Sequence, residues 1–169
     1  MKTRTLQCLG PHGFHTLNYY EWGDAGNDDV VICAHGLTRN GRDFDYLAQA
    51  LGARFRVLCP DIAGRGRSAW LPHKEDYGYQ QYCADMAALI ARSGARRISW
   101  VGTSMGGLIG MLLGAQAGSP IERFVINDIG PFIPKVSIER IAGYVGQEVS
   151  FADLDSFERY IRMISAPFG

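Results

Sequence analysis

The sequence predicts an α/β protein in which a mostly parallel sheet is covered by helices on both faces. Three observations support this class. Short apolar runs alternate along the chain with segments whose apolar residues recur at helical spacing. The run Val30–Ala34 contains no polar residue, which is typical of a strand buried on both faces. Apolar residues make up 47% of the chain, which is enough for a packed core.

The expected elements follow in order from the N-terminus. Two strands open the chain, at residues 5–9 and 14–22, and the turn-forming run Gly10-Pro11-His12-Gly13 separates them. Short apolar runs predict four further strands, at 30–34, 55–59, 98–101 and 124–126. Apolar residues at helical spacing predict helices between these strands, over 44–51, 82–94 and 105–117. This alternation favours a parallel sheet built from strand–helix–strand units.

The pattern changes after Pro131. Two amphipathic stripes follow one another with no strand between them: Ile138, Ile141, Ala142 and Val145, then Leu154, Phe157, Ile161 and Ile164. We interpret these stripes as the beginning of a helical cap or lid. The predicted division is a core over residues 1–134 and the start of the cap over residues 135–169.

Charge and composition exclude several classes of partner. The 17 Lys and Arg residues balance 17 Asp and Glu residues, so no attraction to nucleic acid or to an anionic membrane is expected. No apolar run reaches the roughly 18 residues of a membrane span, and residues 1–10 do not contain the apolar block of a secretory signal. We therefore expect a cytoplasmic protein. Nothing in the sequence indicates its oligomeric state.

The cysteines give no sign of a metal site. Four of them stand far apart, with no Cys-x-x-Cys spacing and no nearby pair of histidines: Cys8, Cys33, Cys59 and Cys83. Free thiols in a reducing compartment are the expectation, and neither a zinc site nor any other metal is expected.

The motif that carries chemistry lies between a predicted strand and a predicted helix. Residues 102–106, Gly-Thr-Ser-Met-Gly, match the pattern Gly-x-Ser-x-Gly. A nucleophile on a sharp strand-to-helix turn has a strained backbone, and small residues two positions to either side let the chain pass. The turn also places the hydroxyl at the positive end of the following helix. Ser104 is therefore the predicted nucleophile, with an incidental serine in a glycine turn as the alternative.

A second segment completes the expected site. His35-Gly36-Leu37 directly follows the strand at 30–34, and such a loop can supply half of an oxyanion hole. The expected donors are the backbone N–H groups of Leu37 and Met105. His35 is a candidate general base, but we interpret it as structural because it precedes the loop that would hold the oxyanion.

Four motifs occur in a fixed order along the chain. They are His35-Gly36, residues 61–68 (Asp-Ile-Ala-Gly-Arg-Gly-Arg-Ser), residues 102–107 and residues 127–131 (Asn-Asp-Ile-Gly-Pro). Together they resemble the α/β-hydrolase superfamily, and most of all its branch of small esterases, lactonases such as 3-oxoadipate enol-lactonase, and carbon–carbon bond hydrolases. The resemblance implies an α/β-hydrolase fold with eight strands, of which strands 1–6 are present, a helical cap after the sixth strand, and no cofactor. Asp61 is expected to order the loop that follows it.

The chain departs from this pattern at the general base. The family's triad runs Ser, acid, His, and no histidine follows Ser104. The base and the last two strands are therefore expected on sequence beyond this chain, and the C-terminal half of the same protein is the expected partner. Asp128 is one candidate for the acid, because some relatives place it after the sixth strand; the commoner position follows the seventh. The strand at 124–126 would otherwise be an exposed apolar edge, which recruits other chains.

The leading functional hypothesis is a serine hydrolase that cleaves a small ester or lactone through a Ser104 acyl-enzyme. A carboxylate nucleophile is absent from the motif, which disfavours the dehalogenase and epoxide-hydrolase branches. One alternative is a carbon–carbon bond hydrolase of aromatic degradation, which would use the same residues. Another is a non-catalytic ligand-binding or inactive member of the fold, because the fragment without its histidine is expected to be inactive.

Overall fold

A computed structural model describes residues 1–146 and 148–166 of the chain. The chain divides into two compact units, the first over Met1–Pro131 and the second beginning at Phe132. The boundary expected from the sequence, between residues 134 and 135, lies three residues after this division. The two units are described separately below.

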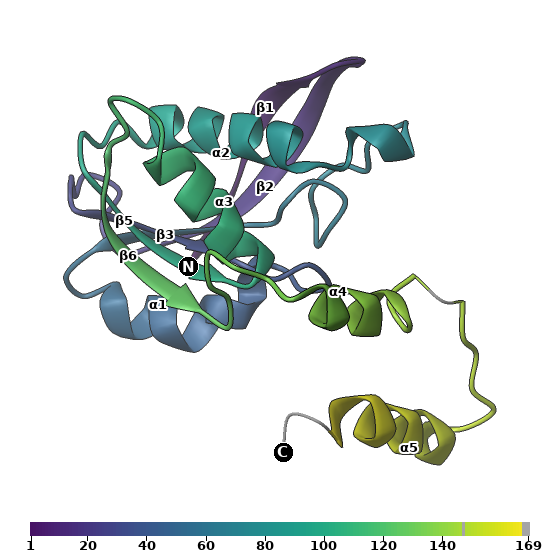
Figure 1. Ribbon diagram of the computed structural model, residues 1–169. Coiled ribbons are helices and arrows are strands. Elements are labelled where there is room, and N and C mark those ends of the chain that lie inside the picture. Colours follow the sequence, from purple (N-terminus) through teal and green to yellow (C-terminus); the bar gives the residue numbers. More distant parts are fainter. Residues whose placement is uncertain (147, 167–169) are drawn as a thin grey trace. The chain divides into compact units, whose positions relative to one another are not determined.

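The first unit is built on a six-stranded mixed sheet (Figure 1). The strands stand in the order β1-β2-β4-β3-β5-β6. β1 and β2 form an antiparallel hairpin, β2 pairs antiparallel with β4, and the pairs β4–β3, β3–β5 and β5–β6 are parallel. Their bounds are β1 Lys2–Gly10, β2 Gly13–Trp22, β3 Val30–Ala34, β4 Arg56–Pro60, β5 Ile98–Thr103 and β6 Ile121–Asn127. The predicted six strands and the predominance of parallel pairing are confirmed.

Helices cover both faces of this sheet (Figure 1). α2 (Tyr79–Ser93) and α3 (Met105–Gly114) lie on one face, where Trp100, Met86 and Ile109 belong to one apolar cluster. α1 (Asp45–Leu51) covers the other face, where the second cluster includes Phe44 and Val57. Because successive strand residues point to opposite faces, β3 supplies both clusters and is buried along its whole length.

Short loops join these elements. A 3₁₀ turn at Gly41–Phe44 leads into α1, and a second at Lys74–Asp76 precedes α2. α2 is followed by its C-cap residue Gly94, whose φ of 72° is the left-handed conformation that glycine adopts without strain. α3 packs tightly on the sheet because Gly106 and Gly110 leave room for Ala34 and Trp100, where a Cβ atom would collide. Gly106 and Gly110 thus form a surface for close packing against the sheet.

Among its described residues, the second unit contains two helices with no strand between them. α4 spans Lys135–Ala142 and α5 spans Leu154–Ser165, as the two stripes predicted. α5 begins at the cap residue Asp153, whose carboxylate accepts a hydrogen bond from the Ser156 amide at 2.7 Å. Phe151 packs edge-on against Phe157 within the same unit. Among the described residues, no helix is long and apolar enough to cross a membrane.

Candidate active site

The candidate site forms where two neighbouring parallel strands end together. β3 and β5 are paired so that Ala34 stands opposite Gly102. The next residues of each strand therefore leave the sheet side by side, at its C-terminal edge. This is the edge at which open α/β sheets bind their ligands. Pairing of the strands brings together His35-Gly36-Leu37 and Ser104, which are about 70 residues apart in the sequence.

Ser104 occupies a sharp, strained turn between β5 and α3. Its φ of 50° and ψ of −117° are unusual for a residue with a side chain. The Ser104 N–H donates to the Asn127 carbonyl at 2.9 Å, and its own carbonyl accepts from the Gly107 N–H at 2.8 Å. A Cβ on Gly102 would lie 2.5 Å from the Gly106 carbonyl oxygen. The turn therefore needs glycine beside the serine for the reason that the motif implied.

Two backbone amides beside Ser104 are free to bind an anion. A Cβ on Gly36 would lie 3.6 Å from the Ser104 Cβ, so the loop that carries Leu37 runs directly beside the serine. In the part of the chain that the structure describes, neither the Leu37 N–H nor the Met105 N–H donates to another group. Met105 also opens α3, whose N-terminus carries a partial positive charge. Both expected oxyanion donors are therefore unengaged among the described residues, and their role stays a prediction.

His35 has both ring nitrogens engaged with the backbone. Nδ1 lies 2.7 Å from the Gly36 carbonyl oxygen, and Nε2 lies 2.9 Å from the Ile62 nitrogen, whose N–H it accepts. These partners assign the neutral tautomer with the proton on Nδ1. The ring is fully buried, and burial lowers its pKa below the ordinary value. His35 therefore holds the Gly36 peptide in place and has no free nitrogen with which to act as a base.

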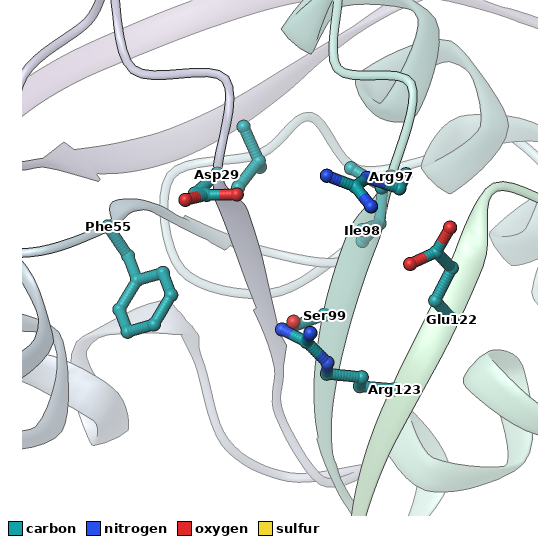
Figure 2. Close-up of a pocket in the computed structure, with 8 residues that line it drawn as sticks. Asp29, Phe55, Arg97, Ile98, Ser99, Glu122 and Arg123 are labelled. Atoms are coloured by element: carbon teal, nitrogen blue, oxygen red, sulfur yellow. The ribbon is translucent and has the colours of Figure 1, made fainter.

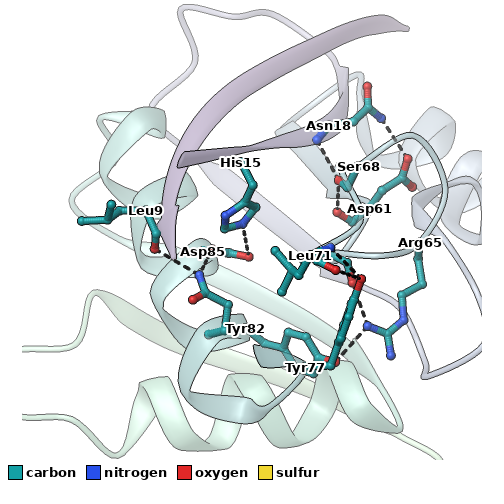
Figure 3. A network of polar contacts seen from close by, with 12 residues as sticks. Leu9, His15, Asn18, Asp61, Arg65, Ser68, Leu71, Tyr77, Tyr82 and Asp85 are labelled. Carbon is teal, nitrogen blue, oxygen red and sulfur yellow. Dashed lines mark hydrogen bonds and ion pairs between the residues drawn. The ribbon is translucent and has the colours of Figure 1, made fainter. Parts of the chain in front are cut away.

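Asp61 is the buried centre of the loops around the site (Figure 3). Its carboxylate accepts hydrogen bonds from the Gly41 N–H and the Arg67 N–H, both at 2.8 Å, and from the Asn18 side chain at 2.9 Å. A Cβ on Gly66 would collide with this carboxylate. Asp61 therefore orders the loop that follows it, as expected, and also ties that loop to the segment after Leu37.

Arg65 reaches from the same loop to the proposed oxyanion segment. Its Nε donates to the Leu37 carbonyl at 3.0 Å, and its Nη1 donates to the Tyr82 hydroxyl on α2 at 2.9 Å (Figure 3). The guanidinium also lies over the rings of Tyr77 and Tyr82. Sequence analysis did not single out Arg65. The only feature of the sequence that points to Arg65 is its place inside the 61–68 motif, because its hydrogen-bond partners Leu37 and Tyr82 come from distant segments.

The remaining predicted site residue, Asp128, follows Asn127 at the end of β6. It has a positive φ of 57° and is exposed. Within the described residues its carboxylate accepts no hydrogen bond, and no histidine nitrogen bonds to Ser104. His12 and His15 pair with Asp76 and Asp85 instead. Asp128 directly follows Asn127, whose carbonyl accepts the Ser104 N–H, and its role as the triad acid stays a prediction.

Neither described cavity is lined by Ser104. One, of about 30 Å³, opens at the opposite edge of the sheet, where Arg97, Glu122 and Arg123 surround the start of β5 and β6 (Figure 2). It has room for about one water molecule. The other, of about 270 Å³, lies between the hairpin turn after β1 and the segment 69–76.

A strained serine between strand and helix, with two unengaged amides beside it on a mostly parallel sheet, is the arrangement expected of a serine-hydrolase site. Residues 29–154 match the family described as alpha/beta hydrolase fold, and the chain belongs to this family.

Similar proteins include hydrolases of esters. The chain is 49% identical over 164 residues to the 3-hydroxybutyrate-oligomer hydrolase of Cupriavidus necator; the match covers 97% of this chain and 56% of that protein. It is 36% identical over 104 residues to an sn-1-specific diacylglycerol lipase of Mus musculus, covering 60% and 33% of the two. A crystal structure of a hydrolase from Rickettsia typhi superposes with a TM-score of 0.88 at 32% identity, covering 98% and 62%. The matches thus span between about a third and about three fifths of the length of these relatives.

Proposed function

We propose that Ser104 is the nucleophile of an ester hydrolase and forms an acyl-enzyme with its substrate. The observation that carries this proposal is the Ser104 turn, with its φ of 50° and the unengaged amides of Leu37 and Met105 beside it. A strained turn is retained only where the surrounding structure enforces it, and such strain concentrates at reactive residues.

The mechanism follows from this geometry. Ser104 Oγ attacks the ester carbonyl carbon, and the Leu37 and Met105 N–H groups stabilise the negative charge that develops on the carbonyl oxygen. The alcohol leaves with a proton, the acyl group stays on Oγ, and water then releases it as a carboxylic acid. The proton is carried by a histidine that polypeptide outside residues 1–169 supplies. Asp128 is the candidate within the chain for the acid that orients this histidine.

We further propose a hydroxyalkanoate ester as the substrate. The 49% identity to a 3-hydroxybutyrate-oligomer hydrolase supports this class, and the similarity to a lipase supports ester cleavage in general. Nothing in the site favours the carbon–carbon bond hydrolases, which would use the same residues on a different bond.

The test is the intact mass of the protein before and after treatment with a fluorophosphonate, which labels an activated serine. Residues 1–169 are joined for this purpose to the C-terminal part of the Cupriavidus necator hydrolase, so that a general base is present. We expect one adduct, mapped to Ser104 and absent from Ser104→Ala. An adduct on another serine, or none on a folded fusion protein, would contradict the proposal. Release of 3-hydroxybutyrate from its dimer, compared with turnover of a simple aryl ester, then tests the substrate class separately.

A further inference from the structure

A buried group of metal-ligating side chains lies away from Ser104, where the β1–β2 hairpin meets α2. Cys8 and His15 are directly paired across the two strands. Asp85 reaches them from α2, and its Oδ2 lies 3.0 Å from His15 Nε2 (Figure 3). One potential ligand atom from each of these three residues lies within 4.8 Å of the other two. The donors are a sulfur, an imidazole nitrogen and a carboxylate oxygen.

All three side chains are buried, at 2% exposure for Cys8, 8% for His15 and 0% for Asp85. The Asp85 carboxylate is held on its other side by the Gln81 amide at 2.6 Å. This arrangement leaves one polar atom unsatisfied, because His15 Nδ1 is buried without a hydrogen-bond partner. Buried unpaired polar atoms are rare in proteins and call for an explanation.

We propose that Cys8, His15 and Asp85 form a binding site for a divalent cation of the Zn²⁺ type. Zn²⁺ takes sulfur, nitrogen and oxygen donors at about 2.0–2.3 Å, so tetrahedral ligands stand about 3.3–3.8 Å apart. The 4.8 Å limit on the present separations means that the ligand atoms need to move by only about 1 Å to reach those positions. The charge also balances: a thiolate, a carboxylate and a neutral imidazole offset a +2 ion, so the buried site carries no net charge.

The larger cavity borders one of the three ligands, His15, whereas Cys8 and Asp85 do not line it. Its volume is about 270 Å³, and His15 forms part of its wall together with Gly10, His12 and Asp76. A metal site needs an entry path as well as its ligands. The same cavity can hold the water that completes a four-coordinate ion, since the chain offers three ligands.

Burial and the Asp85 carboxylate raise the pKa of Cys8 to about 12 while no cation is bound. A bound Zn²⁺ would replace the thiol proton, because a coordinating thiol is deprotonated. The cluster is far from Ser104 in the sheet order, because β2 is separated from β5 by β4 and β3. The site would therefore fasten the hairpin to α2, and this inference does not rest on the proposed hydrolase activity.

The experiment uses Co²⁺ as the probe, added to the purified protein after removal of bound metal with a chelator. We expect one equivalent to bind, with a thiolate-to-Co²⁺ charge-transfer band in the near-ultraviolet that Zn²⁺ abolishes. Zn²⁺ at about 100-fold above its Kd should raise the Tm by about 5–10 °C. A folded wild-type protein without this band would overturn the proposal, whatever the variants do.

Matched cysteine variants assign the site. Cys8→Ser keeps a hydroxyl that can bond to Asp85, so it should fold and lose the charge-transfer band. Cys83→Ser changes a half-buried thiol on α2 outside the cluster and should leave the band intact. Asp85→Asn should weaken binding by about tenfold or more. A band that survives in Cys8→Ser would place the ion at another thiol, such as Cys33 or Cys59, and would also overturn the proposal.

Discussion

At the scale of single residues, the candidate site depends on side chains that hold the backbone and need not touch a substrate. His35 donates a hydrogen bond to the Gly36 carbonyl and accepts one from the Ile62 N–H, and Arg65 donates one to the Leu37 carbonyl. Since the oxyanion donor at Leu37 is a backbone N–H, its direction is set by these neighbours. Misplacement of such a donor affects the transition state more than the bound substrate.

Arg65→Met should lower kcat by roughly tenfold with little change in KM, because the Leu37 amide loses its anchor while substrate contacts remain. The measurement is steady-state ester hydrolysis by the fusion protein described above. Arg67→Met is the matched control, since Arg67 takes part through its backbone N–H and its side chain is exposed. Equal rates for wild type and Arg65→Met would show that Arg65 does not position the oxyanion loop.

His35 should make the free energy of unfolding depend on pH. Burial lowers its pKa in the folded state, so below about pH 6.5 the unfolded chain binds a proton more readily than the folded one. The stabilisation by neutral His35 is complete above that pH and is lost as the pH falls, by at most about 1.4 kcal/mol per pH unit. The nearby Asp61 carboxylate opposes the shift but does not reverse it.

The free energy of unfolding, measured by urea denaturation from pH 7.5 to pH 5, should therefore fall more steeply for the wild type than for His35→Gln. The glutamine keeps an acceptor for the Ile62 N–H but does not titrate. Because the other histidines are present in both proteins, the difference between the two curves isolates His35. Parallel curves would contradict the assignment of a buried neutral ring.

At the scale of elements, the close approach of α3 to β3 sets the position of Ser104. Gly106 packs against the Ala34 backbone, immediately before His35, so the helix and the oxyanion loop share this contact. The atoms nearest to Gly106 are backbone atoms of Ala34, which cannot move aside as a flexible side chain could. The positions of the α3 N-terminus and of Ser104 therefore depend on Gly106 having no Cβ atom.

Gly106→Ala should destabilise the fold by about 1–3 kcal/mol or more, because overpacking against backbone cannot relax. Gly78→Ala is the matched control: it lies at the N-cap of α2 with an extended φ of −152°, and a Cβ there meets nothing within 4 Å. Its cost should be about 0.5–1 kcal/mol, because alanine is a poorer N-cap than glycine. Chemical denaturation of both variants checks this, and similar stabilities would show that α3 can shift away from β3.

At the scale of the whole molecule, β6 ends the sheet with one neighbouring strand, β5, among the described residues. Phe124 and Val125 on this strand are 41% and 57% exposed. The match to relatives covers 56% of the Cupriavidus necator protein, so further polypeptide is available in such relatives to cover this edge. This supports the expectation that the chain works together with the C-terminal half of its fold.

Ester hydrolysis should accordingly require that C-terminal part. We expect residues 1–169 alone to show no turnover of an aryl ester, and the fusion to the C-terminal part of the Cupriavidus necator hydrolase to show turnover that Ser104→Ala abolishes. Turnover by residues 1–169 alone, lost in Ser104→Ala, would mean that a base within the chain serves Ser104. A catalytic histidine outside the chain would then be excluded.

Much of the fold could be predicted from the sequence because its signals are local. Apolar runs such as Val30–Ala34 mark buried strands, and Gly-x-Ser-x-Gly marks the turn at Ser104, since only glycine permits the close contacts beside it. The two stripes after Pro131 likewise predicted α4 and α5. Strand ends extended further than predicted, as in β1 and β6, because pairing with a neighbour continues past the last apolar residue.

By itself, then, the sequence determined the class of fold, the nucleophile candidate and the segment that lies beside it. Only the tertiary structure decided what depends on distant partners. Both ring nitrogens of His35 form hydrogen bonds with backbone groups, and Arg65 binds the Leu37 carbonyl. Cys8, His15 and Asp85 lie together in one buried cluster. Local patterns fix what each segment forms, but hydrogen bonds and metal ligands act over a few ångströms in space, and the pairing of strands determines which segments meet there.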